Sequence, residues 1–129
     1  MGTTVLIVDD NAGLRALMRE IVAAESDFHV VGEAADGAEA MRLAQELRPD
    51  IMLLDLVLPR VDGLEVLRWI KAERPEIKVI VVTAHAEDFY RQAAAAGGTD
   101  AFLLKKTLGT VLVPTVQRLC GSMPPPSAS

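Results

Sequence analysis

The sequence has few of the features that mark secreted, membrane or nucleic-acid-binding proteins. Its 129 residues include one cysteine, Cys120, which excludes an internal disulfide and therefore a disulfide-stabilised secreted scaffold. No apolar run approaches the ~18 residues of a membrane span, and no basic leader precedes the first apolar segment. Acidic residues outnumber basic ones by 18 to 13, which argues against nucleic-acid binding through this domain. We therefore expect a cytoplasmic protein that binds neither membranes nor nucleic acid through this part of the chain.

The residues that are present suffice for one packed domain, since half of them are hydrophobic. Short unbroken apolar runs, typical of strands buried on both faces, alternate with apolar stripes at helical spacing. The strand-like runs are residues 5–8, 28–31, 51–54, 77–82 and 102–104. The helical stripes are residues 14–22, 40–47, 64–70, 89–96 and 112–119.

Five alternations of strand and helix predict an α/β fold with a parallel sheet covered by helices on both faces. We expect the flavodoxin-like, doubly wound (βα)5 arrangement with strand order 2-1-3-4-5. Asp36 and Asp62 are each followed directly by glycine and, three residues after the aspartate, by glutamate, a pattern typical of helix N-caps.

The last part of the chain differs from the rest. Residues 121–129 contain three of the seven prolines and no periodicity, so we assign residues 1–120 to the domain and 121–129 to a tail or the start of a linker. Pro114 falls inside the last helical stripe. With Thr110 as the N-cap, a helix would tolerate this proline near its start, and we expect a late-starting or bent last helix.

Polar side chains follow the predicted strands where each one ends. Asp9 and Asp10 follow the first strand, Asp55 the third, Thr83 closes the fourth and Lys105 the fifth. Each has an ordinary explanation when taken alone: the acidic pair can cap a helix, threonine often closes a strand, and lysine can end one in solvent. Asp55 is harder to explain, because apolar residues flank it and a buried unpaired carboxylate is costly.

The carboxyl ends of parallel strands meet at one edge of the sheet, so these five side chains should converge. Three carboxylates would repel one another, and a divalent cation together with the Lys105 ammonium would balance their charge. A donor set of oxygen atoms favours a hard cation, and an open rim suits Mg²⁺.

These residues resemble the receiver domains of bacterial two-component response regulators, over residues 3–120. The matching stretches are Asp9-Asp10, Asp55-Leu-Val-Leu-Pro59 with Asp62-Gly63, Thr83-Ala84 and Phe102-Leu-Leu-Lys105. The resemblance implies that Asp55 is the phosphoacceptor and that a histidine kinase, or a small phosphodonor, supplies the phosphoryl group. It also implies that Thr83 hydrogen-bonds this group and that Lys105 pairs with it. The implied Mg²⁺ ligands are Asp9, Asp10, Asp55 and the backbone carbonyl of Val57.

The resemblance further implies a conformational switch. Thr83 would move toward the phosphoryl group and allow Phe102 to turn inward, which would reshape the face formed by the fourth helix, the fifth strand and the fifth helix. The alternative is that Phe102 is an ordinary core aromatic. We expect this face to support phosphorylation-enhanced dimerisation and to control an output, such as a DNA-binding domain outside this chain. Val57 and His85 flank the implied path of the attacking water and would tune the lifetime of the phosphorylated form. The alternative for His85 is that its side chain is simply exposed and takes no part.

Other functions remain as alternatives. One is a receiver-like interaction scaffold that phosphorylation does not regulate. Another is a hydrolase, but phosphatases with an aspartate nucleophile place it after the first strand with a second acid two residues on, and Asp9-Asp10-Asn11 lacks this spacing. Nucleotide-binding glycine motifs are absent from the sequence. We thus expect no enzyme activity beyond the chain's own phosphorylation and dephosphorylation.

Overall fold

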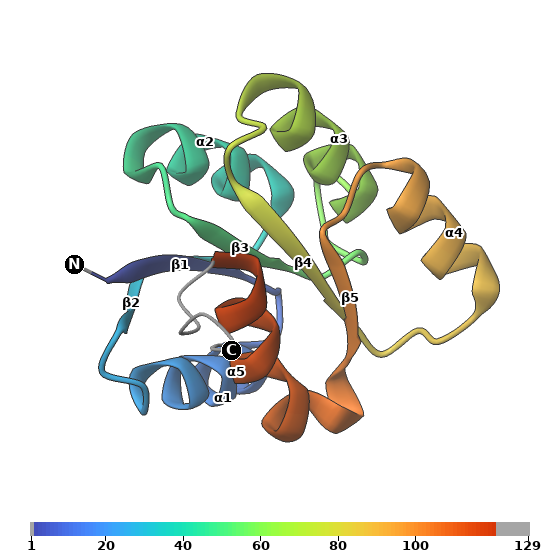
Figure 1. The fold of residues 1–129 in the computed structure, drawn as a ribbon. Helices are drawn as coiled ribbons and strands as arrows, with labels where there is room; N and C mark the ends of the chain where they lie inside the picture. Colours follow the sequence, from blue (N-terminus) through green and yellow to red (C-terminus); the bar gives the residue numbers. More distant parts are fainter. Residues whose placement is uncertain (1, 121–129) are drawn as a thin grey trace, which may run out of the picture.

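A computed structural model describes residues 2–120; the predicted tail, 121–129, lies outside them. Strands and helices alternate along the described chain (Figure 1). The strands are β1 (Thr3–Val8), β2 (Phe28–Ala34), β3 (Ile51–Leu54), β4 (Lys78–Thr83) and β5 (Ala101–Leu104). The helices are α1 (Ala12–Ala23), α2 (Gly37–Leu47), α3 (Gly63–Glu73), α4 (Asp88–Ala96) and α5 (Leu108–Cys120), with a short 3₁₀ helix η1 (Lys105–Thr107) before α5.

The five strands form one parallel sheet in the order β2-β1-β3-β4-β5, which confirms the predicted topology. The order reverses between β1 and β3, because the chain moves from β1 outward to β2 and then returns to β3 on the other side. In such sheets, ligands bind beyond the carboxyl ends of the strands at this reversal. The fold therefore directs attention to the residues that follow β1 and β3.

Helices cover both faces of the sheet. Figure 1 shows α1 and α5 on one face and α2, α3 and α4 on the other. Each face has its own apolar cluster: Val5 and Ile7 pack with α1 and α5, whereas Leu6 and Val8 pack with the helices of the opposite face. Because successive strand residues point to opposite faces, a strand covered on both sides must be apolar throughout, as these four residues are.

The predicted helix caps are present. The Asp36 carboxylate accepts a hydrogen bond from Glu39 N (2.9 Å), and the Asp62 carboxylate accepts one from Leu64 N (3.3 Å). Each bond satisfies a backbone N–H that the first turn of the helix leaves without an intrahelical acceptor.

The fourth helix presents a different face from the one predicted. Phe89, which the apolar stripe placed inward, is 68% exposed, whereas Tyr90 packs against the core and Ala94 is buried. A run of four alanines gives the helix no strong apolar direction, so the tertiary contacts of Tyr90 decide which side faces the sheet.

Of the two forms expected for the last helix, late-starting or bent, the late start is wrong. Helix α5 begins at Leu108, directly after η1, and Pro114 is in its interior with its ring exposed. Because η1 leads into the helix, no cap at Thr110 is needed. Proline cannot donate the usual backbone hydrogen bond to the carbonyl of residue 110. In the same turn, Thr115 Oγ1 donates to the Val111 carbonyl (2.7 Å).

Within residues 2–120, the helices are too short or too polar for any of them to cross a membrane.

Candidate functional site

The loop after β1 places two carboxylates in different environments. Asp9 is fully buried, whereas Asp10 is exposed. Asp9 Oδ1 accepts a hydrogen bond from Asn11 N (2.8 Å), and Asn11 in turn caps α1 through Leu14 N. The acidic pair therefore does not cap α1 itself, because Asn11 fills that position and leaves the two carboxylates to the site.

Asp55 follows β3 directly and is 5% exposed. Its Oδ1 accepts a hydrogen bond from Val57 N (3.2 Å). Gly63, the first residue of α3, lies against the same backbone: a Cβ there would be 2.3 Å from the Asp55 carbonyl oxygen. The close approach of Gly63 thus fixes the loop that carries the buried carboxylate.

Lys105 joins the two buried carboxylates. Its Nζ lies 3.0 Å from Oδ2 of Asp9 and 3.0 Å from Oδ2 of Asp55. Burial opposes the charge of the ammonium, but the close carboxylates of Asp9 and Asp55 outweigh this effect and raise the pKa of Lys105 above its ordinary value. The ammonium therefore remains charged between the two carboxylates.

Burial also opposes the charge of Asp55. It raises the pKa of Asp55 above its ordinary value, and the neighbouring Asp9 carboxylate adds to the rise. The hydrogen bond and charge of Lys105 and the hydrogen bond from Val57 oppose it but do not cancel it. The three carboxylates of Asp9, Asp10 and Asp55 nevertheless outnumber the one ammonium of Lys105, and this excess of acidic groups favours a further cation.

The carboxylates fit a hard divalent cation. Asp9, Asp10 and Asp55 each offer an oxygen, and these oxygens lie within 4.8 Å of one another. Asp9 Oδ2 is buried, and although it lies close to Lys105 Nζ, it makes no hydrogen bond of good geometry among the described residues. An all-oxygen donor set with an incompletely satisfied buried carboxylate is typical of Mg²⁺ sites.

Thr83 ends β4 and is fully buried. Its Oγ1 accepts a hydrogen bond from His85 N (3.2 Å), so its own hydroxyl proton remains available for another acceptor. Phe102 on β5 is half-buried, and the guanidinium carbon of Arg91 lies 4.7 Å from its ring centroid.

The two residues predicted to tune the lifetime differ in their surroundings. Val57 is 47% exposed and offers no side-chain hydrogen bond. The His85 ring stacks on Tyr90 at 4.7 Å between centroids, and its Nδ1 lies 3.8 Å from a Glu87 carboxylate oxygen. The tyrosine stacking and the nearby carboxylate thus restrict the imidazole.

The structure brings Asp9, Asp10, Asp55 and Lys105 together as predicted. Arg15 on α1 was not among the predicted site residues, yet its Nη1 donates to the Asp9 carbonyl (2.7 Å). No sequence pattern indicates this bond, because every residue has a backbone carbonyl.

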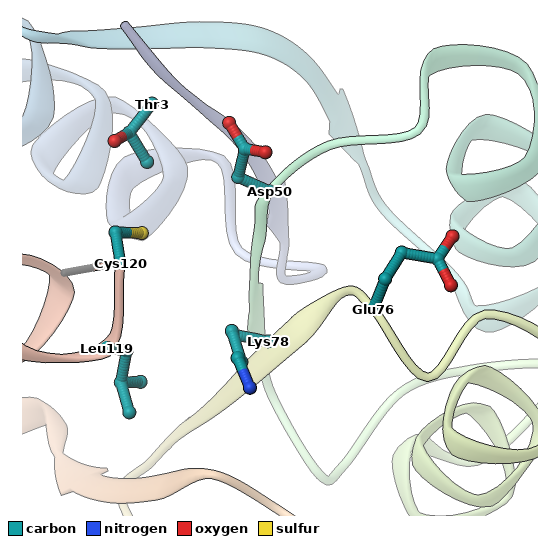
Figure 2. Close-up of a pocket in the computed structure, with 6 residues that line it drawn as sticks. All are labelled: Thr3, Asp50, Glu76, Lys78, Leu119 and Cys120. Carbon is teal, nitrogen blue, oxygen red and sulfur yellow. The ribbon is translucent and has the colours of Figure 1, made fainter.

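A hollow of about 290 Å³ lies at the edge of the sheet opposite to the acidic site, where the strands begin (Figure 2). Its lining residues are Thr3, Asp50, Glu76, Lys78, Leu119 and Cys120. Burial raises the pKa of the Cys120 thiol above its ordinary value, the Asp50 charge adds to the rise, and Thr3 and Lys78 oppose it. Within residues 2–120, three acidic side chains close enough together to hold a metal ion are found at the carboxyl edge alone.

The profile of the response regulator receiver domain matches residues 5–117. The response regulator protein VraR of Staphylococcus aureus is 37% identical over 118 residues, which are 92% of this chain and 56% of VraR. The chain thus spans about half the length of the curated relatives it matches.

Several solved structures resemble this chain over most of its length and of their own. A DNA-binding response regulator of the LuxR family from Staphylococcus aureus superposes with a TM-score of 0.86 at 32% identity, covering 91% of this chain and 98% of that one. A chain of the CheX–CheY–BeF₃–Mg²⁺ complex from Borrelia burgdorferi superposes with a TM-score of 0.85 at 26% identity, covering 92% and 89%.

Proposed function

The chain belongs to the response regulator receiver family, and from that premise we propose that it is a Mg²⁺-dependent, phosphoaccepting switch of a two-component system. Asp55 receives the phosphoryl group from a histidine kinase. The observation that carries the proposal is the position of the Lys105 ammonium, 3.0 Å from both buried carboxylates. A buried carboxylate beside a fixed ammonium and two further acids has the components that phosphoryl transfer requires.

The nucleophile is a carboxylate oxygen of Asp55. It attacks phosphorus, the bond from phosphorus to the donor nitrogen of phosphohistidine breaks, and an acyl phosphate forms on Asp55. Such transfer depends mainly on positioning and charge neutralisation. The hydrogen bond from Val57 N and the contact of Gly63 with the Asp55 backbone supply the positioning.

Lys105 and Thr83 hold the transferred group. The Lys105 ammonium, which already pairs with Asp55, shifts its contact to a phosphoryl oxygen. The Thr83 hydroxyl, whose oxygen accepts from His85 N, donates its proton to another phosphoryl oxygen. Asp9, Asp10, Asp55 and the Val57 carbonyl would hold Mg²⁺, which supplies positive charge against the incoming anion. The Mg²⁺ in the related CheX–CheY complex supports this assignment.

The chain's own chemistry would be limited to gaining and losing this phosphoryl group. Water that attacks the acyl phosphate would pass Val57 and His85, which together set the lifetime. The signal would leave through Thr83 and Phe102 to the face formed by α4, β5 and α5, where phosphorylation would favour dimerisation.

We propose that the output is transcriptional and that the protein is located in the cytoplasm. A LuxR-family DNA-binding regulator is among the similar structures, and this chain spans 56% of VraR. A DNA-binding output domain outside this chain would fit both findings.

Labelling with radioactive acetyl phosphate tests the proposal. We expect incorporation in the presence of Mg²⁺, loss of incorporation in EDTA, and none in Asp55→Asn. Asp50→Asn, at the opposite edge of the sheet, serves as the matched control and should label normally. Labelling that persists in EDTA or in Asp55→Asn would reject the scheme, and a wild-type chain that never labels would favour the unregulated scaffold.

A further inference from the structure

The α1 residue Arg15 reaches back to the acidic loop from which the helix starts. Its Nη1 donates a hydrogen bond of 2.7 Å to the carbonyl oxygen of Asp9. This carbonyl belongs to the peptide unit that joins Asp9 to Asp10. Because a peptide unit is planar, a bond that fixes its oxygen also fixes the direction in which the chain enters Asp10.

The guanidinium is itself held in place. Arg15 Nε lies 3.2 Å from Oε1 of Glu33 on β2, and the other carboxylate oxygen of Glu33 pairs with Arg19. The side chains of Arg15 and Glu33 are only 20% and 28% exposed. Ala34, which follows Glu33, accepts a hydrogen bond from Asp9 N (3.0 Å). Strand β2 therefore holds the Asp9 backbone directly at its nitrogen and through Arg15 at its oxygen.

Asp10 depends on this support more than Asp9 does. Asp9 is buried, and its carboxylate accepts a hydrogen bond from Asn11 N. Asp10 is exposed, and no hydrogen bond to its carboxylate is found among residues 2–120. The position of the Asp10 carboxylate is thus set by the backbone that Arg15 holds.

We propose that Arg15 and Glu33 form a positioning pair for the cation site, with Arg15 fixing the Asp9–Asp10 peptide and Glu33 fixing Arg15. The inference rests on the proposed function, since it concerns how the same acidic loop binds its divalent cation. Glu33 has a second effect: its carboxylate offsets the positive charge that Arg15 places beside the site, and that charge would otherwise repel a cation.

Isothermal titration of the full chain with Mg²⁺ alone tests the pair without any activity measurement. We expect Arg15→Met to raise the Kd for Mg²⁺ roughly tenfold, because substitution of a residue that holds a metal ligand in place typically weakens metal binding by this factor or more. Glu33→Gln should raise it several-fold, and the double variant no more than Arg15→Met, because the two residues act as one unit. Arg15→Lys should recover part of the loss, since one ammonium cannot bind the Asp9 carbonyl and Glu33 as a planar fork does.

Two matched controls separate positioning from a general loss of charge. Arg42→Met removes an arginine from the exposed Arg42–Glu46 ion pair on α2, and Arg19→Gln removes the outer partner of Glu33. Both should change the Kd less than twofold. Melting temperatures in EDTA show whether each variant folds, and if Arg15→Met does not fold, Glu33→Gln decides.

The outcomes distinguish this inference from the proposed function. A folded Arg15→Met or Glu33→Gln that binds Mg²⁺ as the wild type does would overturn the positioning pair and leave the phosphoacceptor proposal intact. A wild-type chain that neither binds Mg²⁺ nor labels with acetyl phosphate would overturn the proposed function, and the positioning pair with it.

Discussion

The ammonium of Lys105 lies 3.0 Å from Oδ2 of Asp55, although 50 positions separate the two residues in the sequence. The same nitrogen lies 3.0 Å from Oδ2 of Asp9, so this one ammonium group pairs with both buried carboxylates. Without a divalent cation, the electrostatic stability of this edge of the sheet depends on Lys105.

Lys105→Met should therefore destabilise the chain in the absence of Mg²⁺. We expect the free energy of unfolding to fall by about 2 kcal/mol, less than for a fully buried pair because the lysine side chain is 20% exposed. Added Mg²⁺ should restore part of the loss, because it balances the same carboxylates. Urea unfolding in EDTA and in Mg²⁺ measures both effects.

Lys106→Met is the control for this change, since Lys106 follows in the chain and is exposed. It should alter the free energy of unfolding by less than about 0.5 kcal/mol. Equal losses in the two variants would contradict the role given to Lys105.

Gly63→Ala should disturb the phosphoacceptor loop. The added methyl group would meet the Asp55 carbonyl oxygen at 2.3 Å and the Leu56 Cα at 2.5 Å, and neither backbone atom can rotate away. We expect a loss of about 2–3 kcal/mol in urea unfolding and slower labelling by acetyl phosphate. Gly109→Ala, where a Cβ meets nothing within 4 Å, should cause neither effect. Normal labelling of Gly63→Ala would show that the loop tolerates displacement.

Pro114→Ala should stabilise the chain. The ring is exposed, so its removal costs little packing, and alanine restores the backbone hydrogen bond to the residue 110 carbonyl. We expect a gain of about 1–2 kcal/mol in the free energy of unfolding, part of the ~3 kcal/mol that proline costs in a helix interior. An unchanged free energy of unfolding would mean that α5 already accommodates the proline.

Beryllofluoride, which mimics the phosphoryl group, should increase the fraction of dimer in sedimentation experiments. Thr83→Ala should remove most of this response, because the buried hydroxyl is the group that couples the site to Phe102 in the proposed switch. Thr107→Ala, an exposed threonine in η1, is the matched control. Identical masses with and without beryllofluoride in the wild type would remove dimerisation from the proposal.

The sheet and its acidic edge were predictable because both follow from simple patterns. Strands buried on two faces must be apolar throughout, as in Ile51–Leu54, and parallel strands bring their carboxyl ends to one edge. Asp9, Asp55 and Lys105 end or follow such strands, so their convergence follows from the topology.

The orientation of α4 and the start of α5 did not follow from the sequence. Phe89 and Tyr90 are adjacent aromatics beside a run of alanines, and packing alone determines which of them faces the core. The preceding 3₁₀ turn starts α5 at Leu108, where no capping side chain marks the boundary. The bond from Arg15 ends on a backbone carbonyl, which carries no sequence signal.

The hollow at the amino edge of the sheet contains a thiol to which a linker can be attached far from the acidic site (Figure 2). Its single cysteine, Cys120, lines that hollow, whereas the phosphoacceptor lies where the strands end. A surface linker attached to the native thiol would therefore leave the acidic edge turned away from the attachment point. Because burial raises the pKa of the thiol, coupling should proceed more slowly than with a free cysteine at the same pH.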